Sequence, residues 1–453
     1  MHPASDYAET LLNTLPSVSC DPPSGRGEHP AFTWARSGAM ALTGRADEAP
    51  RLAPAPLATC AIGALDALRA LAPTSRLALE RGPLASPVDG AALLGERAAY
   101  LGLRRRGPIS PGGSCHLLRA ADGWIAVNLP RPDDRALLPA WMEEEDEETG
   151  PEPWRLVASH VAKRRAVDLV ARARLLGLAV AQAGPPRGVA PPWFRVAARG
   201  TRRKRSRPLV LDLSALWAGP LCGRLLGLAG ARVVKVECVR RPDGARYGSA
   251  GFYEALNAEK ESVALDLRTS RGVACLRRLL QHADVVIEYA RPRALAQLDI
   301  DAAMFAEEGL VWVSITGYGR REPEAHWTAY GDDAAAASGL AAATGDPDAP
   351  LFCGDAIADP LAGIHAALAA LAQWRSGGGA LLEISLRDVT AHCLSFGRDG
   401  PDARVEVTNS GFEVVDGQTR VPVAAPRAAL PVGRARPIGA DTASVLGELG
   451  ISC

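Results

Sequence analysis

The chain has 453 residues, more than one hydrophobic core usually supports, so we expect two domains or lobes. Apolar residues make up 47% and charged residues 23% of the chain, which are ordinary globular values. The 51 Lys and Arg residues balance the 51 Asp and Glu residues, which excludes a global charge that would recruit nucleic acid or an anionic membrane.

The first part of the chain carries few clear strand signals. Residues 1–30 lack a basic start followed by an apolar core, so we expect an N-terminal extension without a secretory signal. Residues 31–198 include the small-residue helix "TCAIGALDALRALA" at 59–72. The basic stretch 199–207 is interpreted as a solvated linker rather than a nucleic-acid patch. No apolar run is long enough to span a membrane.

From residue 208 onward, apolar strands alternate with helices. Strands are predicted at 208–214, 231–237, 262–267, 284–289 and 310–319, and helices at 219–230, 271–283 and 359–372. Such alternation predicts a parallel sheet covered on both faces, which is the doubly wound, Rossmann-like α/β class. We assign this lobe to residues 208–400 and expect residues 401–453 to pack back on it as a C-terminal tail.

An internal repeat connects the two halves. "SGAMALTGRADEAP" at 37–50 parallels "SGLAAATGDPDAP" at 338–350, and each stretch continues into a small-residue helix. In this alignment Thr59 occupies the place of Asp359. The sequence therefore predicts a second, α+β lobe built from a degenerate copy of the first.

Asp359 lies directly before Pro360, at the predicted start of a helix. One interpretation is a helix cap, because Asp is favoured at the N-cap and Pro at the first helical position. Such a cap stabilises by about 1 kcal/mol and needs no function. The internal repeat helps to judge the capping interpretation, because Thr59 in the other copy would cap its helix nearly as well as Asp does. Because only one of the two copies has a carboxylate at this position, the residue indicates a specialised site.

Several other chemistries have no support in the sequence. The first strand–helix turn lacks the G-x-G-x-x-G pattern of dinucleotide binding, although Glu237 ends the second strand where a ribose-binding acid would lie. There is no G-x-S-x-G motif, and the eight His residues show no ligand-like spacing. Nine scattered Cys residues, without a C-x-x-C pair, argue against a zinc site or a disulfide framework and favour a cytoplasmic protein.

Five segments in order carry a resemblance to a known family. They are "LDLSALWAGPLCGRLLGLAGARVVKVE", "LNAEKESVALDL", "ADVVIEYARP", "SITGYG" and "SGLAAATG…IADPLAGIHAALAAL". Over about residues 207–390 the chain resembles the class III coenzyme A transferases, a family that includes formyl-CoA transferase, carnitine-CoA transferase and α-methylacyl-CoA racemase. The ending "PVGRARPIGADTASVLGELG" is similar to the family's carboxyl terminus as well.

The resemblance implies that Asp359, four residues before Gly363 and six before His365, is a nucleophile. Its carboxylate would attack an acyl-CoA thioester and form a mixed anhydride, so CoA moves between carboxylic acids. CoA thioesters would be substrates, and no permanent cofactor or metal is implied. We expect helix N–H groups to keep Asp359 ionised at neutral pH and His365 to serve packing.

The resemblance also implies a CoA site, which we place by matching positions. Its expected members are Trp217, Ala218, Lys235, Arg240, Asn257, Lys260, Tyr289, Ala290, Arg291 and Tyr330. Departures from the family occur at Tyr289, where Asn is usual, at Arg293, where Gly is usual, and at Glu261, where a basic residue is usual. Tyr330 replaces the His of the racemase members, which disfavours proton abstraction there.

Residues 30–200 resemble family material in an unusual order. "SPGGSCHLLRAADGWIAVNL" at 110–129 is similar to the family's substrate loop, here Gly112 and Gly113, and the "DGW" turn after it. Our hypothesis is that two complementary, eroded protomers are fused into an intramolecular pseudo-dimer, with a homodimer as the other possibility. The functional alternatives are an acyl-CoA racemase or isomerase and a non-catalytic binding or scaffold protein.

Overall fold

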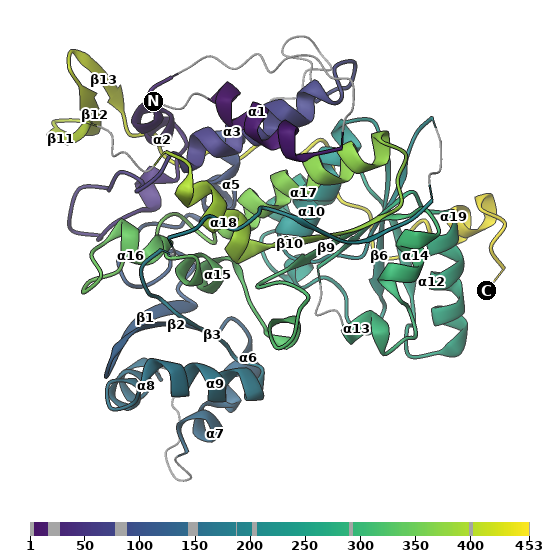
Figure 1. The fold of residues 1–453 in the computed structure, drawn as a ribbon, viewed down its shortest axis with the longest axis horizontal. Helices are drawn as coiled ribbons and strands as arrows, with labels where there is room; N and C mark the ends of the chain where they lie inside the picture. The colour runs from purple at the N-terminus through teal and green to yellow at the C-terminus, as the bar shows by residue number, and fades with distance from the viewer. Residues whose placement is uncertain are drawn as a thin grey trace.

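A computed structural model describes residues 4–16, 28–77, 88–143, 153–186, 188–201, 206–289, 293–397 and 402–452. A seven-stranded sheet lies at its centre, and two small three-stranded sheets lie away from it at the periphery (Figure 1). Among these residues, no helix combines the length and the apolar character that crossing a bilayer requires.

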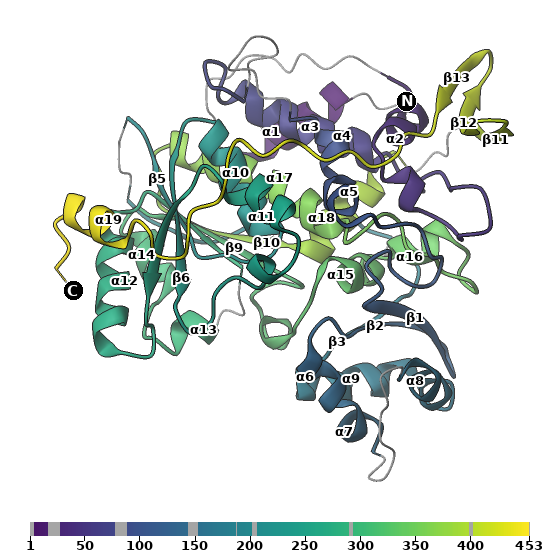
Figure 2. The same ribbon diagram turned by 180° about the vertical axis from the view of Figure 1, so that it is seen from behind.

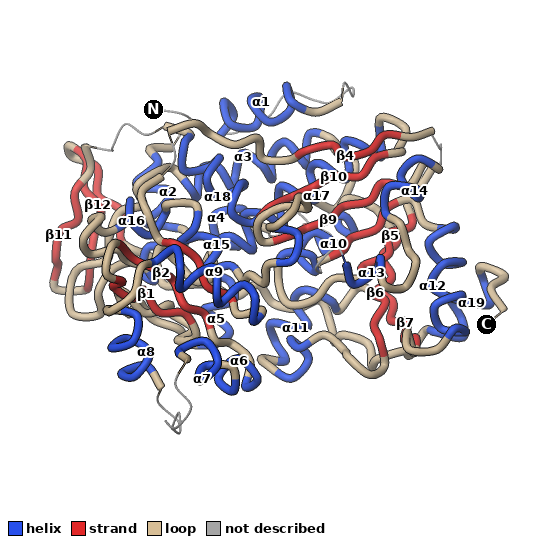
Figure 3. Tube along the Cα trace, turned by 60° about the horizontal axis from the view of Figure 1, so that its bottom comes forward, coloured by secondary structure: helices blue, strands red, loops and turns tan. Residues whose placement is uncertain are grey.

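The central sheet confirms the predicted α/β class. Its strand order is β4-β10-β9-β8-β5-β6-β7, and every pairing is parallel except that of β4 with β10. Figure 3 shows these strands side by side. The bounds are β4 Arg195–Arg199, β5 Leu209–Asp212, β6 Arg232–Cys238, β7 Glu261–Leu265, β8 Val285–Glu288, β9 Val311–Thr316 and β10 Ala380–Ser385. Strands β5 to β9 occupy the predicted segments, because their continuous apolar runs are buried on both faces.

The two faces of this sheet support separate cores. Val210 of β5 packs with α10 (Ala218–Leu228) and α17 (Ala358–Arg375) in one cluster. Its neighbour Leu211 packs in another, with α12 (Ser270–His282), α14 (Ala302–Glu307) and α19 (Thr442–Glu448). Successive residues of a strand point to opposite faces, so helices on both sides are required to cover them.

Two expected boundaries differ from the structure. Residue 198, the predicted end of the first half, lies inside strand β4. The next residue, Arg199, still pairs with Ala380 in the central sheet. The predicted extension 1–30 contains α1 (Ala4–Thr14), which packs on α3 (Leu57–Ala70). Tyr7 of α1 is fully buried, so this helix belongs to the core. Both elements make contacts with residues far along the chain, which local patterns do not encode.

The peripheral sheets have the same strand order but different connections. Strands β1 (Cys115–Ala120), β2 (Gly123–Asn128) and β3 (Ala179–Gln182) form one of them, with four helices between β2 and β3. Those helices are α6 Pro132–Ala136, α7 Leu138–Met142, α8 Trp154–Val161 and α9 Ala166–Leu176. The other sheet joins β11 (Arg404–Thr408), β12 (Gly411–Asp416) and β13 (Thr419–Pro422) by short turns. From β13 the chain runs past α10, in front of it in the view of Figure 2, to α19.

Two observations concern the cysteines and possible metal ligands. Six described cysteines carry free thiols, and Cys275 of α12 is disulfide-bonded, a bond that the sequence pattern, which argued against a disulfide framework, did not indicate. Spacing along the chain carried no signal, because a bridge depends on which residues meet in the fold. Within the described ranges, no group of three or more His, Cys, Asp or Glu side chains could hold a metal ion.

Candidate active site

Asp359 is not a helix cap. The helix α17 begins at Ala358, and its N-cap, Ile357, makes no capping hydrogen bond. Asp359 instead lies within the first turn, with its backbone N–H donating to the carbonyl of Ala356 at 2.9 Å. Ala356 has φ 42°, a left-handed conformation that costs a residue with a side chain about 1 kcal/mol or more. The capping interpretation is therefore wrong, and the loop before the helix is strained.

Three groups surround the Asp359 carboxylate. The hydroxyl of Tyr289 donates to Oδ1 at 3.3 Å, and the backbone N–H of Ala218 also bonds the carboxylate. A Cβ atom built on Gly331 would lie 2.3 Å from Oδ2, so only glycine fits there. Tyr289 and Ala218, both predicted from the sequence, are thus brought to Asp359 from the ends of β8 and the start of α10. Asp359 keeps 6% of its surface exposed.

Burial raises the pKa of Asp359 to about 7. The positive charge of Arg97 opposes this rise most, followed by the bonds from Tyr289 and Ala218. The expectation that helix N–H groups alone would keep the carboxylate fully ionised is therefore wrong. Desolvation of the charged form outweighs them. Near neutral pH the ionised and protonated forms coexist, and the ionised form is poorly solvated, which favours nucleophilic attack.

Arg97 is the residue that the sequence interpretation missed. It lies on α5 (Glu96–Leu101), and its Nη1 donates to both oxygens of Asp355 at 2.7 and 2.6 Å. Asp355 is fully buried. The predicted Gly112 lies beside this pair, since a Cβ atom there would be 3.5 Å from Nη2 of Arg97. A lone Arg in a short helix carries no signal that it meets a loop 258 residues away.

Two further acidic residues lie beside Asp359. Burial, followed by the charge of Asp355, raises the pKa of Asp332 to about 7, and its Oδ1 accepts a hydrogen bond from the N–H of Ala356 at 2.9 Å. Asp333 is fully buried and accepts bonds from Asn128 at 3.0 Å and from the Tyr318 hydroxyl at 2.9 Å. The pair of acids in "YGDDAAAASG" was an available signal, because two carboxylates in an apolar helix start are rarely left without a role.

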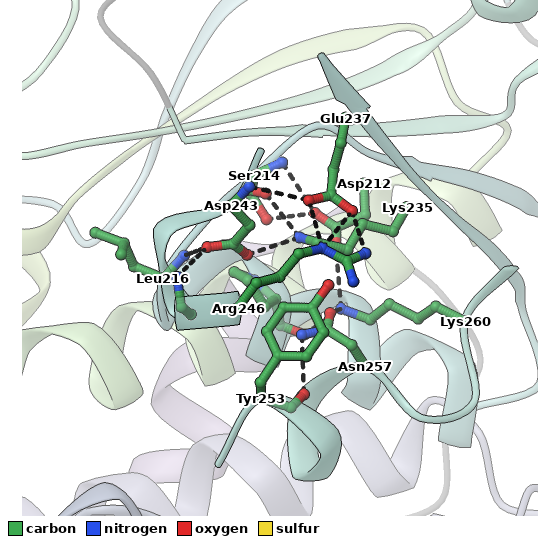
Figure 4. Close-up of polar contacts among 12 residues, drawn as sticks. Asp212, Ser214, Leu216, Lys235, Glu237, Asp243, Arg246, Tyr253, Asn257 and Lys260 are labelled. Atoms are coloured by element: carbon green, nitrogen blue, oxygen red, sulfur yellow. Dashed lines mark hydrogen bonds and ion pairs between the residues drawn. The ribbon is translucent and has the colours of Figure 1, made fainter. Parts of the chain in front are cut away.

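Lys235 and Lys260, which the resemblance places in the CoA site, are buried (Figure 4). Nζ of Lys260 contacts Asp212 at 2.7 Å and the Oδ1 atom of Asn257 at 2.9 Å. Nζ of Lys235 lies 3.0 Å from Oδ2 of Asp243. Although burial opposes it, these two lysines lower the pKa of Asp212 to about 2. Both lysines and Asn257 therefore have partners within the protein, because Asp212 ends β5 and Asp243 lies in the loop after β6.

The other predicted CoA positions differ in exposure and in position along the fold. Trp217 is 2% exposed and packs edge-on against Phe252, while the side chain of Arg240 is 63% exposed, 3.7 Å from Asp266. Ala290 and Arg291 lie outside the described residues. Tyr330 is the N-cap residue of α15 (Gly331–Ala337).

Glu261 and Arg293, two residues that depart from the family pattern, lie in β7 and in a short helix, respectively. Glu261 forms an ion pair with Arg232 at 2.9 Å, so its charge is compensated within the protein. Arg293 begins the short helix α13 (Arg293–Ala296).

His365 is a packing residue in this structure, as expected. It is fully buried; its Nε2 lies 2.9 Å from the Tyr7 hydroxyl and its Nδ1 2.7 Å from the carbonyl of Leu361. Both ring nitrogens therefore have partners, and the ring is held two turns from Asp359.

The fold and site define a Rossmann-like α/β protein in which a helix on the central sheet begins with a buried, strained carboxylate segment. Residues 208–405 match the model of CoA-transferase family III. Over these residues the chain is similar to that family, as the resemblance implied.

Two curated relatives illustrate the similarity. The succinate–glutarate CoA-transferase of Agrobacterium fabrum is 35% identical over 206 residues, 41% of this chain and 52% of that protein. The succinyl-CoA–D-citramalate CoA-transferase of Chloroflexus aurantiacus is 36% identical over 198 residues, 40% of this chain and 49% of that protein. The chain spans about half the length of these relatives.

Among solved structures, a CaiB/BaiF family protein from Brucella suis is 27% identical with a TM-score of 0.41. The match covers 46% of this chain and 64% of that one.

Proposed function

We propose that this protein transfers CoA between carboxylic acids, with Asp359 as the covalent nucleophile. The observation that carries the proposal is the placement of Asp359: buried, within bonding distance of Tyr289 and with a pKa raised to about 7. A carboxylate with a purely structural role is normally ion-paired or exposed to solvent, whereas Asp359 is 6% exposed and forms no ion pair with any described residue. The curated relatives named above are CoA-transferases that act on succinate, glutarate or citramalate, which favours the same reaction type here.

In the proposed step, a carboxylate oxygen of Asp359 attacks the carbonyl carbon of an acyl-CoA thioester. A C–O bond forms, the C–S bond breaks, and CoA leaves as the thiolate, which leaves an aspartyl mixed anhydride. The thiolate then attacks the aspartyl carbonyl and releases the acyl group as a carboxylate. An acceptor carboxylate next attacks the aspartyl thioester carbonyl; the C–S bond breaks, and a second mixed anhydride and CoA thiolate are formed. The thiolate then attacks the acceptor carbonyl of this anhydride, which gives the acceptor's CoA thioester and releases the Asp359 carboxylate. Tyr289 and the Ala218 N–H orient the attacking carboxylate.

We also propose that the two halves are related as complementary copies, so that one chain supplies both sides of the site. Gly63 of α3 and Gly363 of α17 occupy matching environments. Cβ atoms built on them would lie 2.5 Å from the carbonyl oxygen of Ala4 on α1 and 2.7 Å from that of Ala218 on α10. By this match α1 corresponds to α10, and Thr59 to Asp359.

The peripheral sheets support the same relation. A Cβ atom on Gly38 would lie 2.6 Å from Cα of Pro426, after β13, and one on Gly339 would lie 2.4 Å from Cα of Pro186, after β3. Each sheet thus lies against the SG turn of the opposite half. This exchange would bring Gly112 of the first half to the loop that precedes Asp359, which is supported by the distance of 3.7 Å between a Cβ atom built on Gly112 and Oδ1 of Asp355. A monomer would then contain one complete site.

The covalent step is tested by trapping. We expect protein incubated with acetyl-CoA and hydroxylamine to carry a hydroxamate on the peptide containing Asp359, detected by mass spectrometry. The Asp348→Asn variant, altered at a side chain that is 94% exposed, should be modified equally. CoA binding without modification would contradict the transferase and favour the racemase or the binding protein. Tyr330 lends the racemase no support, since burial raises its pKa to about 12.

We expect the exchange rate to depend on pH through Asp359. Only its ionised form attacks, so kcat/KM should rise about tenfold per pH unit below pH 7 and level off above it. Asp332 also has a pKa of about 7, so the Asp332→Asn variant serves as the comparison. The midpoint should persist in that variant. A profile that stays flat down to pH 5 would contradict the role of Asp359.

A further inference from the structure

The N-terminal half, which lies outside the matched residues 208–405, meets the loop before Asp359 through an ion pair. Nη1 of Arg97, on α5, donates to both carboxylate oxygens of Asp355, at 2.7 and 2.6 Å. Asp355 is fully buried, whereas the side chain of Arg97 is 28% exposed. The pair therefore joins the two halves of the chain shortly before the proposed nucleophile.

The loop between this ion pair and Asp359 is held from both sides. Ala356, the residue after Asp355, has a left-handed φ of 42°. Its N–H donates to Oδ1 of Asp332 at 2.9 Å, and its carbonyl accepts the N–H of Asp359 at 2.9 Å. A Cβ atom on Gly331 would lie 2.4 Å from that carbonyl oxygen and 2.3 Å from Oδ2 of Asp359. Because the contact is this close, a shift of Asp355 would displace the Asp359 carboxylate as well.

Arg97 also acts on the charge of the nucleophile. Of the described groups with the strongest effect on the Asp359 carboxylate, Arg97 is the positively charged one. The others are the hydroxyl of Tyr289 after β8, the N–H of Ala218 on α10, and Asp333 of α15, whose negative charge opposes ionisation. Without Arg97, an ionised Asp359 would keep its hydrogen bonds but lose the positive charge that offsets burial.

We propose that Arg97 is a positioning residue: it holds the loop that carries Asp359 and favours the ionised, reactive form of that carboxylate. The N-terminal half, although outside the family match, is then required for attack on the thioester. This inference rests on the proposed function for the identity of the nucleophile. A pair that served stability alone would act on Asp355, but the charge of Arg97 also reaches Asp332 and Asp359.

The kinetic test measures kcat/KM against pH for exchange of labelled CoA into acetyl-CoA, which needs no acceptor acid. Arg97→Gln should raise the midpoint from about 7 by about one pH unit or more, so the rate at pH 7 falls about fivefold or more and recovers at alkaline pH. Asp355→Asn should lower the midpoint, because that carboxylate then no longer balances the charge of Arg97.

Two further variants complete the kinetic test. Arg97→Lys should keep the wild-type midpoint, since a single nitrogen makes both bonds to Asp355. Arg104→Gln, at an exposed arginine of the same half, is the control and should leave the midpoint unchanged.

A second measurement does not depend on turnover. Urea unfolding of the wild type and of Asp359→Asn gives their stability difference at each pH. This difference should grow above pH 4 and level off near the folded pKa of Asp359, about 7. When both proteins also carry Arg97→Gln, it should level off about one pH unit or more higher, because the folded pKa of Asp359 rises.

The outcomes separate this inference from the transferase proposal. Unmoved midpoints in both Arg97→Gln and Asp355→Asn would show a purely structural pair and overturn the inference, while the transferase stands. A raised levelling-off point without any acylation of Asp359 would support the effect of Arg97 and overturn the transferase. If Arg97→Gln fails to fold, Asp355→Asn decides: a lowered midpoint or levelling-off point supports the inference, and an unmoved one contradicts it.

Discussion

The Asp359→Asn variant is expected to lose CoA exchange by about a thousandfold or more, the loss typical of a removed nucleophile. The amide is nearly isosteric, so the bond from Tyr289 and the fit against Gly331 are kept while attack on a thioester is lost. Exchange is measured with labelled CoA, and CoA affinity by titration. Affinity should change only a few-fold, because Asp359 is proposed to act on the acyl carbon and not on the CoA moiety.

Thermal unfolding of the same variant checks that its loss is not misfolding. Burial raises the folded pKa of Asp359 from 3.8 to about 7, so the folded wild type binds more protons than the unfolded chain between these values. Its stability therefore falls as pH rises through this window. Asn lacks this charge, so the variant should be more stable relative to the wild type at pH 8 than at pH 4. A variant that retains a tenth of the wild-type rate would exclude Asp359 as the nucleophile.

The Lys260→Met variant is expected to lose about 3–5 kcal/mol of the free energy of unfolding. Lys260 is 3% exposed, and its Nζ contacts Asp212 at 2.7 Å and the carbonyl of Pro220 at 2.8 Å. Without it, a fully buried carboxylate keeps only Lys235 as its compensating lysine. Urea unfolding measures the loss, and the exposed Lys163, changed to Met, serves as the matched control.

The same variant separates two interpretations of the lysines. If Lys260 contacted CoA, as the resemblance implied, its loss would weaken CoA binding and leave stability nearly unchanged. The ion pairs in Figure 4 predict the reverse: a large loss of stability, with CoA affinity reduced only as far as the folded fraction falls. Unchanged stability with much weaker CoA binding would restore the first interpretation.

The Rossmann-like lobe was predictable because its signals are local. Each strand from β5 to β9 is a short apolar run, and each is followed by a helix or a polar turn, so burial on both faces is encoded in adjacent residues. Asp359 was recognisable for a similar reason. Its neighbours Pro360 and Gly363 lie in one helix, and the family spacing is contained within seven residues.

The sequence by itself determined the parallel sheet, the helix α17 and Asp359 as the candidate nucleophile. The tertiary structure alone decided that Lys260 is a buried ion-pair partner and that Arg97 lies beside Asp355. The contact of Lys260 with Asp212 joins residues that are 48 positions apart in the chain, and that of Arg97 with Asp355 joins residues that are 258 positions apart. Charge and desolvation act through space, so the ionisation of a side chain depends on which distant groups the fold places around it.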